Sequence, residues 1–147
     1  MYRRTIIPIV LLVIATDQIT KYIINYYIRI YDSVRIFPFL HIVNVRNTGA
    51  AFGMLKGIDS NFFIFISIIA IVFVIIMLKK KTYNSFGLSL LLGGAIGNLI
   101  DRLIYGYVID FIDISFGRFH WPAFNVADSS LTIGIAIILI TSILKKN

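Results

Sequence analysis

Four long apolar runs constrain the fold of this chain more than any other feature. They lie at about residues 6–28, 62–78, 86–104 and 124–144. A helix needs about 20 mainly apolar residues to cross the hydrocarbon core of a bilayer, and the second run is close to the lower limit. Hydrophobic residues make up 59% of the 147 residues, and a core of this size cannot bury so much apolar surface. We therefore expect a membrane protein with four spanning helices.

The composition excludes several kinds of site. The sequence has no cysteine, so disulfide scaffolds, cysteine-bound zinc, iron–sulfur clusters and thiol nucleophiles are ruled out. The two histidines, His41 and His120, do not have the HExxH spacing of a zinc-binding helix. We predict no metal site, no cofactor and no nucleic-acid partner.

Basic residues near the ends of the runs predict the topology. Arg3 and Arg4 precede the first run, Lys79–Lys81 separate the second from the third, and Lys145 and Lys146 follow the fourth. With an even number of spans, these three clusters share one side of the membrane. The two sides carry equal numbers of Lys and Arg, but these clusters directly abut the spans, which is the arrangement typical of cytoplasmic loops. We expect both termini to be cytoplasmic.

The two outer segments have features of their own. Residues 39–46 form two alternating sets and are rich in β-branched residues, which predicts a short strand or hairpin at the membrane surface. The sets are Phe39, His41, Val43 and Val45, and Leu40, Ile42, Asn44 and Arg46. Residues 105–123 contain Tyr105, Tyr107 and Trp121, and such aromatic residues are typical of the membrane–water interface.

Three of the four runs carry a polar stripe. Asp17, Lys21 and Asn25 are spaced i, i+4, i+8 and share one helical face. The third run carries Gly94, Asn98, Asp101 and Arg102, and the fourth carries Asn125, Asp128, Ser129 and Thr132. An ionisable side chain in hydrocarbon costs roughly 2.5–3.5 kcal/mol. We therefore expect the stripes to converge on a polar pocket near the outer surface.

Local pairing accounts for part of this polarity. Asp17 and Lys21 lie one helical turn apart and can neutralise each other. Arg102 can likewise hold Asp101 by hydrogen bonds. Both pairs therefore have a structural interpretation beside a functional one.

Asp110 and Asp128 have no basic residue within four positions. They flank the predicted outer turn between the last two spans, so their carboxylates can approach each other. Two close carboxylates repel when both are ionised, and the pair then retains a proton. Such a pair supplies a base that activates water and an acid that protonates a leaving group. Asp113 is a competitor that spacing alone does not exclude.

Five blocks of the sequence carry a resemblance to a known family. They are DQITK (17–21), NTGAAFG (47–53), GGAIGNLIDR (93–102), VIDF (108–111) and FNVAD (124–128). Together, in this order and on these spans, they resemble bacterial lipoprotein signal peptidase, also called signal peptidase II, a family of four-span aspartic peptidases (family A8).

The resemblance implies a catalytic dyad of Asp110 and Asp128. It implies an all-α membrane protein with one integral domain, residues 1–147. A small extracytoplasmic β-cradle would lie at about residues 30–59, and an interfacial, mobile lid segment at about 105–123. Supporting or substrate-binding roles fall to six further residues: Asn47, Asn98, Arg102, Asn125, Asp17 and Lys21.

The implied reaction is removal of the signal peptide from prolipoproteins whose Cys carries a diacylglyceryl group, with cleavage just before that Cys. The expected location is the bacterial cytoplasmic membrane, with the site near the extracytoplasmic face. The expected partners are the precursor and membrane lipid, without an obligate protein partner. We also expect Asn47 to bind the substrate peptide near the scissile bond, although Asn-Thr-Gly is equally good turn chemistry.

Three other functions remain possible from the residues alone. A small proton-coupled transporter could use Asp17, Asp101 and Asp128 as a relay. A metal-dependent membrane enzyme could hold Mg²⁺ on aspartate oxygens. An assembly subunit could use the small-residue motif Gly93-x-x-x-Gly97 for helix packing, but it would leave the polar stripes unexplained.

Overall fold

The computed structural model describes residues 2–49 and 60–145. Its elements, in chain order, are α1 (Tyr2–Tyr27), β1 (Ser33–Phe37), β2 (Leu40–Asn47), α2 (Ser60–Lys80), α3 (Ser85–Tyr105), β3 (Val108–Phe116), β4 (Phe119–His120) and α4 (Val126–Leu144). The four predicted spans are therefore confirmed as helices. The end of the predicted β-cradle and residues 50–53 of the second motif lie outside the described residues.

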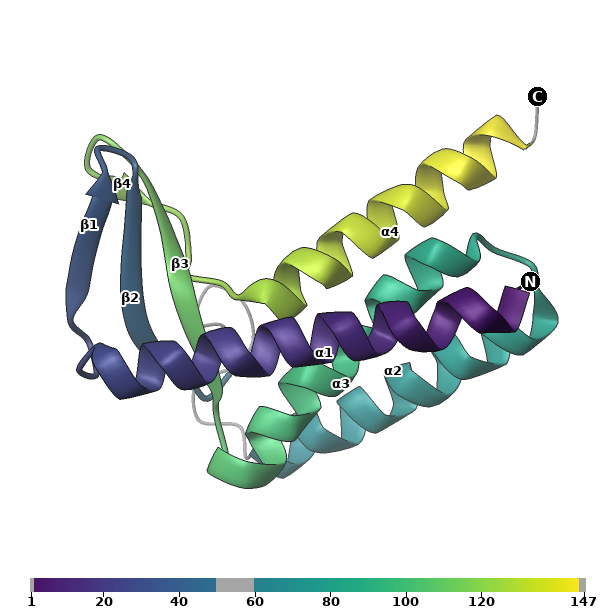
Figure 1. Ribbon diagram of the computed structural model, residues 1–147, viewed down its shortest axis with the longest axis horizontal. Coiled ribbons are helices and arrows are strands. Elements are labelled where there is room, and N and C mark those ends of the chain that lie inside the picture. Colours follow the sequence, from purple (N-terminus) through teal and green to yellow (C-terminus); the bar gives the residue numbers. More distant parts are fainter. Residues whose placement is uncertain (1, 50–59, 146–147) are drawn as a thin grey trace.

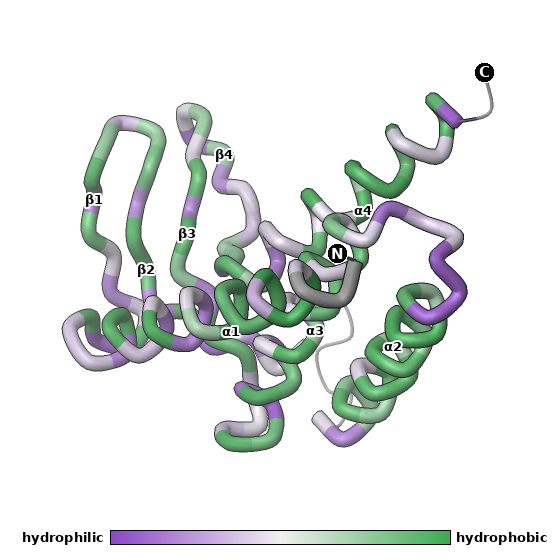
Figure 2. Tube along the Cα trace, turned by 45° about the vertical axis from the view of Figure 1, so that its right-hand side comes forward, coloured by the Kyte–Doolittle hydropathy of each residue, from purple (hydrophilic) through white to green (hydrophobic). Residues whose placement is uncertain are grey.

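Each of the four helices is long and apolar enough to cross a membrane. α2 is the clearest case, because Figure 2 shows hydrophobic residues on every side of it. Only Phe63 and Val74 of this helix are buried. A helix that is apolar all round and largely uncovered by protein is suited to lipid.

α3 is the central helix, and it packs against α1, α2 and α4. Three glycines allow this close approach. A Cβ atom added to Gly93 would lie 2.7 Å from Val13 Cβ, and one added to Gly94 would lie 2.5 Å from the carbonyl oxygen of Ala127. One added to Gly97 would lie 2.7 Å from Asp17 Oδ2. The Gly93-x-x-x-Gly97 motif therefore serves helix packing within the chain.

A four-stranded antiparallel sheet with the order β1-β2-β3-β4 lies at one end of the bundle (Figure 1). The predicted strand at residues 39–46 is confirmed as β2, which forms a hairpin with β1. α1 begins and α4 ends at the opposite end of the bundle, where the turn between α2 and α3 also lies (Figure 1). Arg3 and Arg4, Lys79–Lys81 and Lys145 therefore lie at the end remote from the sheet.

Part of the segment expected to form a lid is a β-strand. α3 ends at Gly106, which adopts the left-handed conformation with φ 77°. The chain then enters β3, which pairs along β2 from Val108↔Asn47 to Ile114↔Leu40. The β-branched content of Val108-Ile109-Asp110-Phe111-Ile112 favours this strand. Both outer segments thus build one sheet.

Candidate active site

Asp110 lies on β3, opposite Val45 of β2. Its side chain is 2% exposed. Each carboxylate oxygen accepts one amide hydrogen bond: Asn125 Nδ2 donates to Oδ1 at 2.7 Å, and Asn47 Nδ2 donates to Oδ2 at 3.0 Å. The carboxylate is therefore fixed from two directions, by the end of the neighbouring strand and by the start of α4.

Asp128 lies in the first turn of α4 and forms a capping box with Asn125. The backbone N–H of Asp128 donates to Asn125 Oδ1 at 2.8 Å, and the backbone N–H of Asn125 donates to Asp128 Oδ2 at 3.3 Å. Asn98 Nδ2 donates to the other carboxylate oxygen at 2.8 Å. The positive end of a helix dipole stabilises a carboxylate at this position.

Asn125 contacts both carboxylates and thereby brings them together. Its side chain is fully buried, its amide group donates to Asp110, and its backbone N–H donates to Asp128. Sequence spacing predicts that the two acids meet between two antiparallel helices. They do meet, but Asp110 approaches from a strand.

The pKa of Asp110 is shifted strongly upward. Burial raises the pKa from 3.8 to about 7, and the negative charge of Asp128 acts in the same direction. The hydrogen bonds from Asn47 and Asn125 oppose this shift, but they are the smaller effects. Near neutral pH, Asp110 therefore exists in both its protonated and its ionised form.

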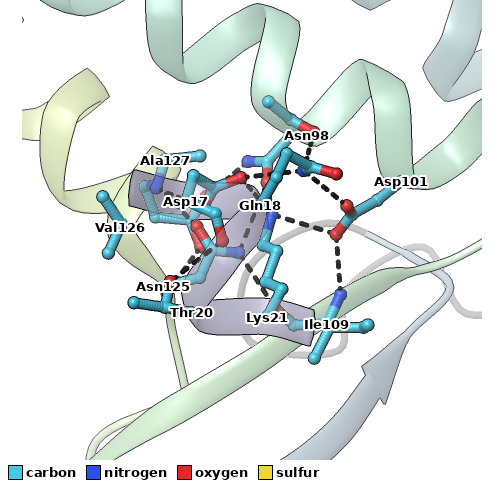
Figure 3. Close-up of polar contacts among 12 residues, drawn as sticks. Asp17, Gln18, Thr20, Lys21, Asn98, Asp101, Ile109, Asn125, Val126 and Ala127 are labelled. Atoms are coloured by element: carbon cyan, nitrogen blue, oxygen red, sulfur yellow. Dashed lines mark hydrogen bonds and ion pairs between the residues drawn. The ribbon is translucent and has the colours of Figure 1, made fainter. Parts of the chain in front are cut away.

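Behind the dyad lies a buried polar network, drawn in Figure 3. Lys21 Nζ lies 2.8 Å from Asp17 Oδ2 and 2.9 Å from Asp101 Oδ2. The predicted Asp17–Lys21 pair is confirmed. The predicted Asp101–Arg102 pair is wrong: Asp101 pairs with Lys21, because it faces α1, whereas Arg102 Nη1 donates to the carbonyl oxygen of Asn98 at 3.3 Å.

Asn47 uses both ends of its amide group within the protein. Its Nδ2 donates to Asp110, and its Oδ1 accepts the backbone N–H of Gly49 at 3.0 Å. The turn interpretation is therefore correct, and the side chain also orients a carboxylate. A direct contact with substrate would use the second hydrogen of the same NH₂ group.

An open cleft with a volume of about 1410 Å³ lies beside the dyad. Near the carboxylates it is lined by Asn47, Asn98, Arg102, Asp110 and Asp128. Arg102 supplies a positive charge near the two carboxylates, and its guanidinium also lies 5.6 Å from the centre of the Phe63 ring.

The remaining polar residues of the stripes do not bind the two carboxylates. Asn25 is exposed, and Ser129 and Thr132 line the cleft but donate to the carbonyl oxygens of Asn125 and Asp128. Asp113 is separate from the dyad, because its carboxylate contacts His120 Nδ1 at 2.8 Å. Within residues 2–49 and 60–145, no group of three or more metal-ligating side chains is found.

Two residues of the network had no predicted site role. Asp101 accepts the backbone N–H of Ile109 at 3.1 Å, and Gln18 donates to Asp101 at 2.9 Å. Asp101 follows Asn98 by one helical turn, so helical spacing offered a signal for it. Gln18 had no such signal, because its nearest polar partner in α3 is 79 positions away in sequence.

The geometry fits what comparisons with known proteins show. A lipoprotein signal peptidase from Thermodesulfovibrio yellowstonii is 48% identical over 136 residues, which cover 92% of this chain and 92% of that protein. One from Staphylococcus aureus is 47% identical over 140 residues, covering 92% of this chain and 86% of the relative.

A solved structure of a bacterial membrane enzyme, determined by the in meso method, is also similar. It superposes with a TM-score of 0.89 at 41% identity, covering 97% of this chain and 90% of the other. Residues 9–144 match the family described as signal peptidase (SPase) II. From the two carboxylates held by Asn125, the four apolar helices and these similarities, it follows that the chain belongs to the signal peptidase II family.

Proposed function

We propose that this protein is a membrane aspartic endopeptidase that removes the signal peptide of prolipoproteins, with Asp110 and Asp128 as its catalytic dyad. The observation that carries the assignment is the contact of Asn125 with both carboxylates beside an open cleft. Two neighbouring acids of this kind share a single proton, and they can act as one base and one acid at the same time.

The environments of the two acids support different roles for them. Asp110, with its pKa raised to about 7, holds the shared proton and acts as the general acid. Asp128, which accepts two N–H donors at a helix N-terminus, is the ionised base. It removes a proton from water as the water oxygen attacks the scissile carbonyl carbon, while Asp110 protonates the carbonyl oxygen.

Collapse of the tetrahedral intermediate reverses these transfers. The proton on Asp128 passes to the leaving amine nitrogen as the C–N bond breaks. The hydroxyl group on the former carbonyl carbon returns its proton to Asp110 as the new carboxyl group forms. Both acids thus regain their starting states, and no other reactant besides water is consumed.

The substrate follows from the position of the site. Asp110 lies on β3 and Asp128 in the first turn of α4, and the sheet lies at one end of the helices (Figure 1). We place this end at the extracytoplasmic face of the bacterial membrane, with both termini cytoplasmic. A Cys that carries a diacylglyceryl group is held at the interface by its lipid, so the peptide bond just before it lies at the depth of the dyad. The signal peptide then lies along the helices.

Cleavage of a lipid-modified precursor by purified protein in detergent tests this proposal. Asp110→Asn and Asp128→Asn should each abolish cleavage, because an amide cannot carry the shuttled proton. Asp113→Asn is the matched control on the same strand and should retain substantial activity. Cleavage at a rate near wild type by either dyad variant would exclude the assigned role, and loss of activity in EDTA that Mg²⁺ or Zn²⁺ restores would favour a metal mechanism.

The proton-coupled transporter is not favoured. Its relay requires Asp17 and Asp101 to exchange protons along a path. In the structure both carboxylates contact the Lys21 ammonium, with exposures of 0% and 1%. An acid held by a buried cation is suited to a fixed position rather than to a proton relay.

A further inference from the structure

Each dyad residue is preceded by a backbone N–H that donates to a buried acid from elsewhere in the fold. Ala127 N–H, just before Asp128, donates to Asp17 Oδ1 at 2.9 Å. Ile109 N–H, just before Asp110, donates to Asp101 Oδ2 at 3.1 Å. The same contact is thus made twice, once at the start of α4 and once in β3.

Lys21 joins the two acids to each other. Its ammonium group contacts Asp17 Oδ2, Asp101 Oδ2 and Asn98 Oδ1 at 2.8, 2.9 and 3.0 Å. These three acceptors match the three hydrogens of the group. Because Asn98 Oδ1 faces the ammonium, its Nδ2 faces Asp128 and donates to it. Figure 3 shows these contacts converging between α1, α3 and the start of α4.

We propose that Asp17, Lys21 and Asp101 form a clamp that sets the separation and orientation of the two dyad carboxylates. They are positioning residues, because they act through the backbone of Ala127 and Ile109 and do not line the cleft. The clamp is needed because β3 and α4 are separate elements. An error of about 1 Å in such a geometry can cost about 100-fold in rate. The inference rests on the proposed dyad.

The energetics of burial support a role beyond stability. The clamp carries two negative charges and one positive charge, all nearly inaccessible to water. Buried ion pairs are a weak source of stability, because desolvation offsets the attraction between the charges. Apolar side chains would fill the same space at less cost, but they would leave the N–H groups of Ala127 and Ile109 without acceptors.

Asp101 offers the cleanest test, because its removal leaves Asp17 and Lys21 as a neutral pair. Asp101→Ala should lower kcat about 100-fold with KM unchanged, since the cleft is not altered. Asp101→Asn keeps an oxygen for the Ile109 N–H and should remain within about tenfold of wild-type kcat. Leu88→Ala, in the core of the same helix with Leu88 3% exposed, is the control: it should lower thermal stability without changing kcat per folded molecule.

Rescue by formate is a second measurement. If Asp101 served only stability, formate would not raise the kcat of the folded variant. A cavity of about 250 Å³ borders the clamp and is lined by Lys21, Asp101 and Ile109 among others. Formate can place a carboxylate oxygen there in Asp101→Ala. It should raise kcat of this variant at least tenfold and leave Leu88→Ala unchanged.

Asp17→Asn tests the contact between Asp17 and the Ala127 N–H. It also replaces the first test if Asp101→Ala does not fold. It keeps an acceptor for Ala127 N–H but replaces the charged contact with Lys21, so kcat should fall about tenfold at constant KM. A wild-type kcat in folded Asp101→Ala would overturn the clamp. If Asp101→Ala does not fold, a wild-type kcat in Asp17→Asn would overturn it instead. Inactive Asp110→Asn and Asp128→Asn beside fully active clamp variants would refute the clamp alone, whereas active dyad variants would refute the proposed function itself.

Discussion

Replacing Asp110 by Asn should abolish cleavage and remove a loss of stability that the wild-type protein suffers as the pH rises. The folded state holds Asp110 in a site that raises its pKa to about 7, compared with an ordinary value of 3.8. The folded protein therefore binds a proton more tightly than the unfolded chain does. The contribution of this proton to stability is complete below the unfolded pKa and is lost as the pH rises through the folded pKa.

The size of this effect follows from the two pKa values. Each unit of difference corresponds to about 1.36 kcal/mol, so the full loss is about 4 kcal/mol. Between pH 5 and pH 8 the wild-type protein should lose roughly 2.6 kcal/mol of unfolding free energy from this group. The Asn side chain does not titrate, so this loss is absent from Asp110→Asn. Any lost hydrogen bond to Asn47 or Asn125 shifts stability equally at every pH.

Thermal unfolding in detergent at pH 5, 6, 7 and 8 measures the difference. The melting temperature of Asp110→Asn should rise relative to wild type between pH 5 and pH 8, with most of the change below pH 7. Asp113→Asn is the control and should follow the wild-type trend. Parallel curves for wild type and Asp110→Asn would show that Asp110 ionises normally and would refute the pKa argument.

Three further predictions concern the site, the helix packing and the topology. Asn47→Ala should reduce turnover of the lipid-modified precursor at least tenfold, about 1.4 kcal/mol of transition-state stabilisation, because Asp110 loses a donor; normal cleavage per folded molecule would restrict Asn47 to its turn. Gly94→Val should lower the melting temperature sharply, because even its Cβ would lie 2.5 Å from the Ala127 carbonyl oxygen; an unchanged melting temperature would contradict the packing described for α3 and α4. In whole cells, an impermeant thiol reagent should label Ser33→Cys but not Thr82→Cys, and the opposite pattern would invert the topology.

The sequence predicted the helices because their signal is local. Each span is a continuous run of apolar residues, and Asp17 and Lys21 lie within one helix, so their pairing follows from helical spacing. Asp110 and Asp128 stood out because no basic neighbour accompanied them. The strand β3 and the partner of Asp101 were missed, because both depend on segments that are remote in the chain: β2 for the strand and α1 for the acid.

By itself, the sequence determined that this chain has four spanning helices, that polar residues are concentrated on three of them, and that two isolated acids lie near one turn. Hydrophobicity and helical period are properties of neighbouring residues, so both can be recognised in the sequence without knowledge of the fold. Only the tertiary structure decided which oxygen faces which donor. Asn125 contacts both carboxylates because a capping box fixes its backbone at the start of α4 while β3 presents Asp110 to its amide group. Lys21 reaches Asp101 because glycines let α1 approach α3 closely. Burial and distance, which set the pKa of Asp110, exist only once these elements have packed.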